Sequence, residues 1–126
     1  KRLYEEIESS HYQKKSYTAD CAEPKSIDEL RGYGLRVEKS QKGKDSIMHG
    51  IQYIQDFEII IHPRCVNFIT EIGNYTWDED RLGNKINRPI DDFNHLMDAM
   101  RYAVEKYAFG RVKVRTFKDK LLNVNK

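Results

Sequence analysis

The feature that most constrains this chain is the alternation of short strand-like runs with longer helix-like runs. Ser16–Asp20 and Leu35–Glu38 each predict a short strand. Glu58–His62 has a continuous apolar centre, which predicts a strand buried on both faces. Val112 and Val114 alternate with basic residues and favour an edge strand. Strands that alternate with helices are typical of an α/β domain built around a sheet.

The segments between these runs have apolar residues at helical spacing. Ser26 and Glu29 have the spacing of a capping box, so a helix is expected to start around Pro24–Ser26. Thr76–Arg88 is polar, with Trp77 as its main apolar anchor, which favours a mobile flap. Its acids fail the EF-hand spacing. The remaining helices are expected at about residues 3–10, from 45 or 46 through 54, at 64–74 and at 91–107, and Gly110 ends the last one.

Composition bounds the class of protein. The chain has 126 residues, 33% charged and 39% hydrophobic, which fits one globular domain covering residues 1–126. It has no apolar run long enough to span a membrane and no P-loop for ATP. Cys21 and Cys65 lack the spacing of a zinc site, so a reducing compartment is expected. The chain begins at Lys1 without a methionine, and we expect it to be part of a longer protein.

Basic residues are clustered although the net charge is only +2. The last stretch has six basic residues against one acid, Asp119. Such clusters can neutralise nucleic-acid phosphates, but charge alone favours a solvated surface. The candidates for DNA binding are Lys39, Lys42, Lys44, Arg111, Lys113 and Arg115.

Asp20 is the first candidate functional residue because it ends a predicted strand. In open α/β sheets, functional groups gather beyond the carboxyl ends of strands. A turn or helix-capping aspartate is an equally simple interpretation, since Pro24 follows closely. The position of Asp20 alone therefore favours the structural role.

His95 and Asp98 are the second candidate pair. They lie three positions apart on the predicted last helix, so their side chains share one face, and Asp91 and Tyr102 extend that polar row. A carboxylate on such a face can hold a divalent metal while the imidazole moves protons beside it. The alternative is a surface pair that contributes only a few tenths of a kcal/mol.

Four sequence blocks, taken in order, resemble one known family. They are Ala19–Leu30, Asp45–Ile51, Asn74–Trp77 and Pro89–Ala103. Together they resemble the C-terminal nuclease domain of the terminase large subunits of tailed phages and prophages, with the greatest similarity to those of Gram-positive hosts. The resemblance implies an RNase H-like α/β fold, a mixed sheet flanked by helices. It also implies a metal-dependent endonuclease that cuts concatemeric viral double-stranded DNA during packaging.

The resemblance also implies the site. Phosphodiester hydrolysis needs an activated water, a neutralised phosphate and a stabilised leaving oxygen, and two Mg²⁺ or Mn²⁺ ions roughly 4 Å apart supply all three. By position, Asp20 and Asp98 match metal-binding acids of the family, and His95 matches its catalytic histidine. Supporting roles are implied for Glu23, Asp91 and Asp92.

One departure from the family pattern concerns the first catalytic aspartate, which the family has on its first strand. No Asp precedes Asp20 in this chain. The first strands are therefore expected to lie upstream, and residues 1–126 alone are expected to be a weak or inactive nuclease. The implied partners are double-stranded DNA, a small terminase subunit, the portal protein and an upstream ATPase domain, in the cytoplasm of the infected host. The alternatives are a DNA-gripping module without catalysis, or another RNase H-like nuclease such as a resolvase or transposase.

Overall fold

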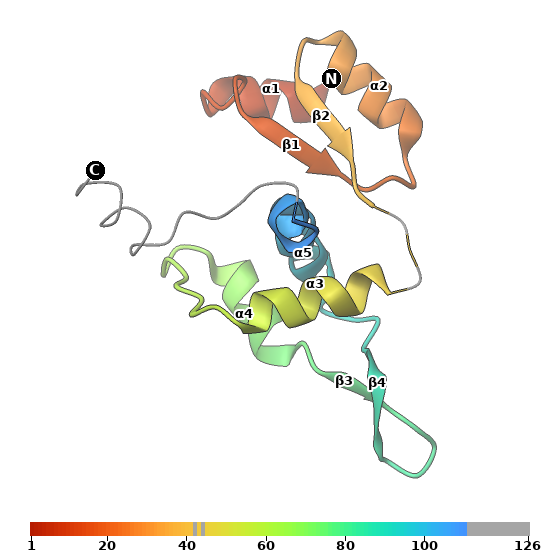
Figure 1. Ribbon diagram of the computed structural model, residues 1–126. Coiled ribbons are helices and arrows are strands. Elements are labelled where there is room, and N and C mark those ends of the chain that lie inside the picture. The colour runs from red at the N-terminus through yellow and green to blue at the C-terminus, as the bar shows by residue number, and fades with distance from the viewer. Residues whose placement is uncertain (42, 44, 111–126) are drawn as a thin grey trace, which may run out of the picture.

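The computed structural model describes residues 1–41, 43 and 45–110. The predicted strand at Val112 and Val114, and five of the six candidate DNA-binding residues, lie outside this part of the chain. In chain order, the elements are α1 (Arg2–Ser9), β1 (Ser16–Ala19), α2 (Pro24–Gly32), β2 (Arg36–Lys39), α3 (Ser46–Gln55), α4 (Val66–Asn74), β3 (Trp77–Glu79), β4 (Lys85–Pro89) and α5 (His95–Ala108) (Figure 1).

The first third of the chain forms a compact β–α–β unit, preceded by α1. β1 and β2 pair in parallel, with Ser16 opposite Arg36 and Ala19 opposite Lys39. Parallel neighbours need a crossover connection, and α2 supplies it. The unit has the main buried apolar cluster of the described residues, in which Ile27 is only 1% exposed. The other members of the cluster are Leu30, Leu35 and Val37, and Tyr4, Ile7, Tyr17 and Ala19 pack against it.

α5 lies between this unit and the helices α3 and α4 (Figure 1). α3 and α4 pack on α5, and so does β1. Polar contacts fasten α5 to the β–α–β unit and to the residues that follow it. The backbone N–H of Gln41 donates to the buried Glu105 carboxylate at 3.1 Å. Lys106 Nζ lies 3.2 Å from Glu38 Oε1 and donates to Ser16 Oγ at 3.2 Å. A buried carboxylate must find such donors, because leaving it unpaired would be costly.

β3 and β4 form an antiparallel hairpin that projects away from α5 (Figure 1). Its turn is organised by Asp80, whose Oδ1 accepts hydrogen bonds from the backbone N–H groups of Leu82 and Asn84, both at 2.9 Å. Gly83 has a φ of +82°, a conformation that glycine adopts without steric cost. The sequence segment interpreted as a flap is therefore a hairpin, with a register shift between Trp77 and Glu79.

Three expectations about local structure are wrong. Glu58–His62 is not a strand in the described structure, and Ile60 is 89% exposed. The capping box does not form, because α2 starts at Pro24 with Glu23 as its N-cap and Ser26 already lies inside the helix. The last helix starts four residues later than expected, at His95.

No helix among the described residues is long and apolar enough to cross a membrane.

Candidate functional site

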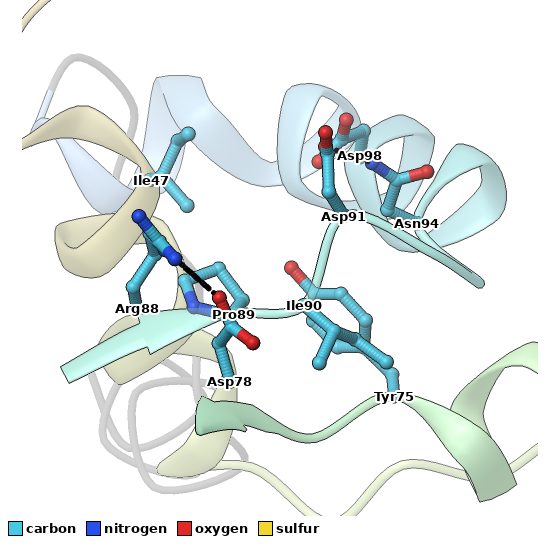
Figure 2. Close-up of a pocket in the computed structure, with 9 residues that line it drawn as sticks. All are labelled: Ile47, Tyr75, Asp78, Arg88, Pro89, Ile90, Asp91, Asn94 and Asp98. Carbon is cyan, nitrogen blue, oxygen red and sulfur yellow. Dashed lines mark hydrogen bonds and ion pairs between the residues drawn. The ribbon is translucent and has the colours of Figure 1, made fainter. Parts of the chain in front are cut away.

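A cavity of about 480 Å³ opens between α3, the hairpin and the start of α5. Figure 2 shows Asp91, Asn94 and Asp98 on the wall formed by α5 and the segment before it, with Asp78 and Arg88 on the wall formed by the hairpin. The lining residues are Ile47, Tyr75, Asp78, Arg88, Pro89, Ile90, Asp91, Asn94 and Asp98. The cavity thus has several carboxylates on a partly apolar floor.

Asp98 is placed by the first turn of α5. Its backbone N–H donates to the Asn94 carbonyl at 2.7 Å, and negative charge is favoured at this end of a helix. Its Oδ1 accepts a hydrogen bond from Arg101 Nη2 at 3.0 Å. The Asp98 side chain is 33% exposed, so it is anchored on one side and open to the cavity on the other.

The segment before α5 explains the late start of this helix. Phe93 has a φ of +52°, a conformation unfavourable for a bulky residue, so the helix cannot extend back through it. Asp92 Oδ1 accepts from the Phe93 N–H at 2.9 Å, and Asp91 Oδ1 accepts from Asn94 Nδ2 at 3.3 Å. Glu71 of α4 accepts from the Leu96 N–H at 2.7 Å and so satisfies a free donor of the first turn. Asp91 therefore stands outside the helix and still lines the cavity.

Asp20 lies at the carboxyl end of β1. The two parallel strands end together here, where the Ser40 N–H donates to the Ala19 carbonyl at 2.8 Å. Asp20 is exposed, and its Oδ1 accepts from the Ala22 N–H at 3.0 Å in a tight turn. Glu23, three residues later, is the exposed N-cap of α2.

The negative charges of Asp20 and Asp98 affect the pKa values of two nearby tyrosines. Burial raises the pKa of Tyr102, and the negative charges of Asp20 and then Asp98 raise it further. Burial likewise raises the pKa of Tyr75, with Asp98 as the second cause. Asp20 and Asp98, far apart in the sequence, thus act on the same phenol of α5.

The other candidate residues are less closely placed. His95 is the first residue of α5, exposed, and not part of the cavity wall. Asp92 is exposed and its carboxylate is occupied by its own turn. Lys39 is exposed at the end of β2. Within residues 1–41, 43 and 45–110, no three His, Cys, Asp or Glu side chains lie close enough together to hold a metal ion.

The sequence interpretation missed the residues that approach from distant elements. Arg88 binds Asp78 across the hairpin, with Nε at 3.1 Å from Asp78 Oδ2, and this contact lowers the pKa of Asp78. Tyr75 and Glu71 come from the end of α4. Only Arg101 could have been identified from the sequence, because it lies three positions after Asp98 on the same predicted helix.

Comparisons with known proteins agree with this architecture. The chain is similar over 110 residues, at 36% identity, to the terminase large subunit of Bacillus phage SPP1, covering 84% of the chain and 26% of that protein. It is 31% identical to the PBSX phage terminase large subunit of Bacillus subtilis (strain 168), over 75% of the chain and 22% of that protein. The chain therefore spans about a quarter of the length of these relatives.

Solved structures give the same result. The nuclease domain of the large terminase g2p from bacteriophage SPP1, with bound Mn, matches 84% of the chain and 62% of its own length, with a TM-score of 0.78 and 35% identity. The large terminase of the thermophilic bacteriophage D6E matches 86% of the chain and 28% of its own length, with a TM-score of 0.65 and 27% identity. The family model described as "Terminase RNAseH like domain" covers residues 1–106. The chain belongs to this terminase family, and its mixed α/β fold is RNase H-like.

Proposed function

We propose that this chain is the nuclease part of a viral DNA-packaging motor, a metal-dependent endonuclease that cuts concatemeric double-stranded DNA. The observation that carries the proposal is the likeness of 84% of the chain to a terminase nuclease domain whose structure has bound Mn. The family model covers residues 1–106, which include β1, the cavity-lining residues and α5 as far as Lys106.

Asp20 and Asp98 are the proposed metal ligands. Their carboxylates supply hard oxygen donors of the kind that Mg²⁺ and Mn²⁺ prefer. A single Mg²⁺ takes only one or two protein carboxylates and fills its remaining positions with water and substrate phosphate oxygens, so a pair of acids on an open surface suits one such ion. The effect of both charges on the pKa of Tyr102 supports their approach to one another.

The neighbouring residues have assisting roles in this proposal. When bound, two divalent ions would activate water and neutralise the phosphate. His95, at the exposed start of α5, would accept or donate a proton beside them. Asp91 shares the cavity wall with Asp98, and Asp92 and Glu23 would act through hydrogen-bonded waters.

The proposed partners follow from membership of the family. They are double-stranded DNA, a small terminase subunit, the portal protein and an ATPase domain of the same polypeptide, all in the cytoplasm of the infected host. Lys39 is the described candidate for a phosphate contact, and it is exposed beside the end of β1. Lys42, Lys44, Arg111, Lys113 and Arg115 complete the proposed DNA-binding set.

A nicking assay on supercoiled plasmid tests the proposal, using the complete gene product that contains residues 1–126. We expect cleavage with Mn²⁺ or Mg²⁺, none with chelator, and a loss of at least about 100-fold in rate for Asp98→Asn. Asp28→Asn is the matched control, because Asp28 is an exposed helical aspartate that lies 3.7 Å from Arg31 and outside the cavity. Full activity of Asp98→Asn would remove Asp98 from the mechanism.

The same assay separates the alternative functions. A DNA-gripping module would retain DNA binding and show no metal-dependent cleavage in any variant. A resolvase would prefer branched DNA over linear duplex. We also expect residues 1–126 alone to cleave more slowly than the complete gene product, because two-metal hydrolysis commonly needs more carboxylates than Asp20 and Asp98 provide.

A further inference from the structure

We propose that Arg101 is a positioning residue that fixes the Asp98 carboxylate for metal binding, and that Gly50 provides the space Arg101 needs. This inference rests on the proposed function, because it assigns Asp98 as a metal ligand. It goes beyond that function by explaining how a half-exposed aspartate at a cavity wall is held in one orientation.

The first observation is the burial of Arg101. Its exposure is 7%, which is unusual for an arginine unless the charge is paired. Its guanidinium donates to Asp98 Oδ1 at 3.0 Å and lies over the Tyr102 ring, 4.8 Å from the centroid. The planar group is thus held by an aromatic face and a carboxylate, and both contacts restrict its orientation.

The second observation is the close approach of α3. A Cβ added at Gly50 would lie 2.5 Å from Cγ and 2.7 Å from Cδ of Arg101, closer than side-chain carbons can pack. Gly50 is itself buried in the middle of α3. Glycine weakens a helix interior by about 0.5–1 kcal/mol relative to alanine. The aliphatic part of the Arg101 side chain occupies the space where a larger residue at position 50 would place its Cβ.

The third observation concerns the two carboxylate oxygens of Asp98. Arg101 takes Oδ1, and no donor within residues 1–41, 43 and 45–110 hydrogen-bonds to Oδ2. The side chain borders the cavity, so Oδ2 is the oxygen available to a cation. Outer residues that orient a metal ligand typically change metal affinity by about 10–100-fold when they are removed.

The direction in which metal affinity changes when Arg101 is removed distinguishes a positioning role from a purely electrostatic one. Arg101 is a cation beside a proposed cation site, so Coulomb repulsion alone predicts that removing it tightens metal binding. Positioning predicts the opposite, because a freed Asp98 must be ordered again when the metal binds. Packing alone predicts a loss of stability with no change in metal affinity.

The experiment is a Mn²⁺ titration of the complete gene product without DNA, followed by the EPR signal of free Mn²⁺. We expect Arg101→Gln to weaken Mn²⁺ binding by about 10–100-fold. Arg101→Lys, which keeps the stem and the charge but lacks the planar fork, should show a smaller loss. Arg31→Gln is the matched control, because Arg31 also faces an aspartate three positions away, Asp28 at 3.7 Å. Unlike Arg101, it donates to the Val37 carbonyl at 2.8 Å, so its loss should change stability without changing Mn²⁺ affinity.

The outcomes separate this inference from the proposed function. Wild-type Mn²⁺ affinity in Asp98→Asn would overturn both. Loss of binding in Asp98→Asn together with unchanged or tighter binding in folded Arg101→Gln would overturn the positioning role alone. Should Arg101→Gln fail to fold, Arg101→Lys decides, since wild-type affinity in that variant means that the planar fork does not position Asp98.

Discussion

The β1–α2–β2 unit and the segment from Phe57 to Ile69 both contain β-branched apolar residues, but the unit buries them and the segment exposes them. In the unit, Ile27 and Val37 are 1% and 4% exposed. In the later segment, Ile59 and Ile60 are 39% and 89% exposed. The difference lies in partners: β2 has β1 as its neighbour at matched register, whereas residues 58–62 pair with no strand in the described structure.

This contrast separates local from non-local causes of structure. Helices satisfy their backbone groups internally, so periodicity is enough to predict them. A strand satisfies its backbone only through a neighbour, so an apolar run predicts the capacity for a strand and not its formation. The four predictions below test how far each region depends on such packing.

The largest expected effect is in the buried unit. Ile27→Ala removes the most buried side chain of the described core and should lower the free energy of unfolding by about 2–5 kcal/mol. Urea denaturation followed by circular dichroism measures it. A loss below about 1 kcal/mol would show that the unit is not the stable part of the molecule.

Gly50→Ala tests the packing of α3 on α5, which joins the two regions. The added methyl would meet the Arg101 stem, and overpacking of this kind costs about 1–3 kcal/mol, offset by up to about 1 kcal/mol of helix propensity. Gly32→Ala is the control, because nothing lies within 4 Å of its added Cβ. Equal stabilities of the two variants, measured by thermal unfolding, would contradict the close contact.

Ile60→Lys addresses the exposed segment and should change the free energy of unfolding by less than about 0.5 kcal/mol. Because an exposed apolar run with unpaired backbone groups favours association, we expect the substitution to reduce self-association at high concentration. Sedimentation velocity of residues 1–126 gives the readout. A large loss of stability would mean that Ile60 is buried in solution.

The smallest effect concerns the hairpin, which is held mainly by exposed polar contacts. The hydrogen bond from Arg88 holds the pKa of Asp78 below its usual range. The contribution of the Arg88–Asp78 pair to stability is therefore complete above the pKa of Asp78 in the unfolded chain, near 3.8. It is lost as the pH falls through the lower pKa of Asp78 in the folded protein. Trp77, the only tryptophan, adjoins Asp78, so its fluorescence should change below about pH 4 in the wild type. Asp78→Asn should lack that step, and an identical profile would contradict the assignment.

Much of the fold was predictable because its signals are local. All five helices and the strands β1 and β2 follow from periodicity and from turn residues. The errors occur where a local rule met a stronger constraint. Proline is favoured in the first turn of a helix, so α2 begins at Pro24, before Ser26. The positive φ of Phe93 is not helical, so α5 begins only at His95.

The candidate site was predictable only in its parts. Membership of the terminase family is confirmed, and the sequence placed Asp98 and His95 together on the last helix. The roles of Asp20, Asp98 and His95 stay predictions. The contributions of Tyr75, Glu71 and Arg88 were not predictable, because each depends on where α4 and the hairpin lie relative to the start of α5.

The central place of α5 has a consequence for the order in which the protein is made. Synthesis proceeds from the N-terminus, and domains begin to fold as their segments emerge from the ribosome. The β–α–β unit has its whole apolar cluster once Val37 has emerged. Asp98, Arg101 and Glu105 emerge much later, and Glu105 must close a long loop to reach its hydrogen-bond partner Gln41. A nascent chain can therefore hold a folded β–α–β unit that lacks Asp98, and the candidate site is complete only after α5 has left the ribosome.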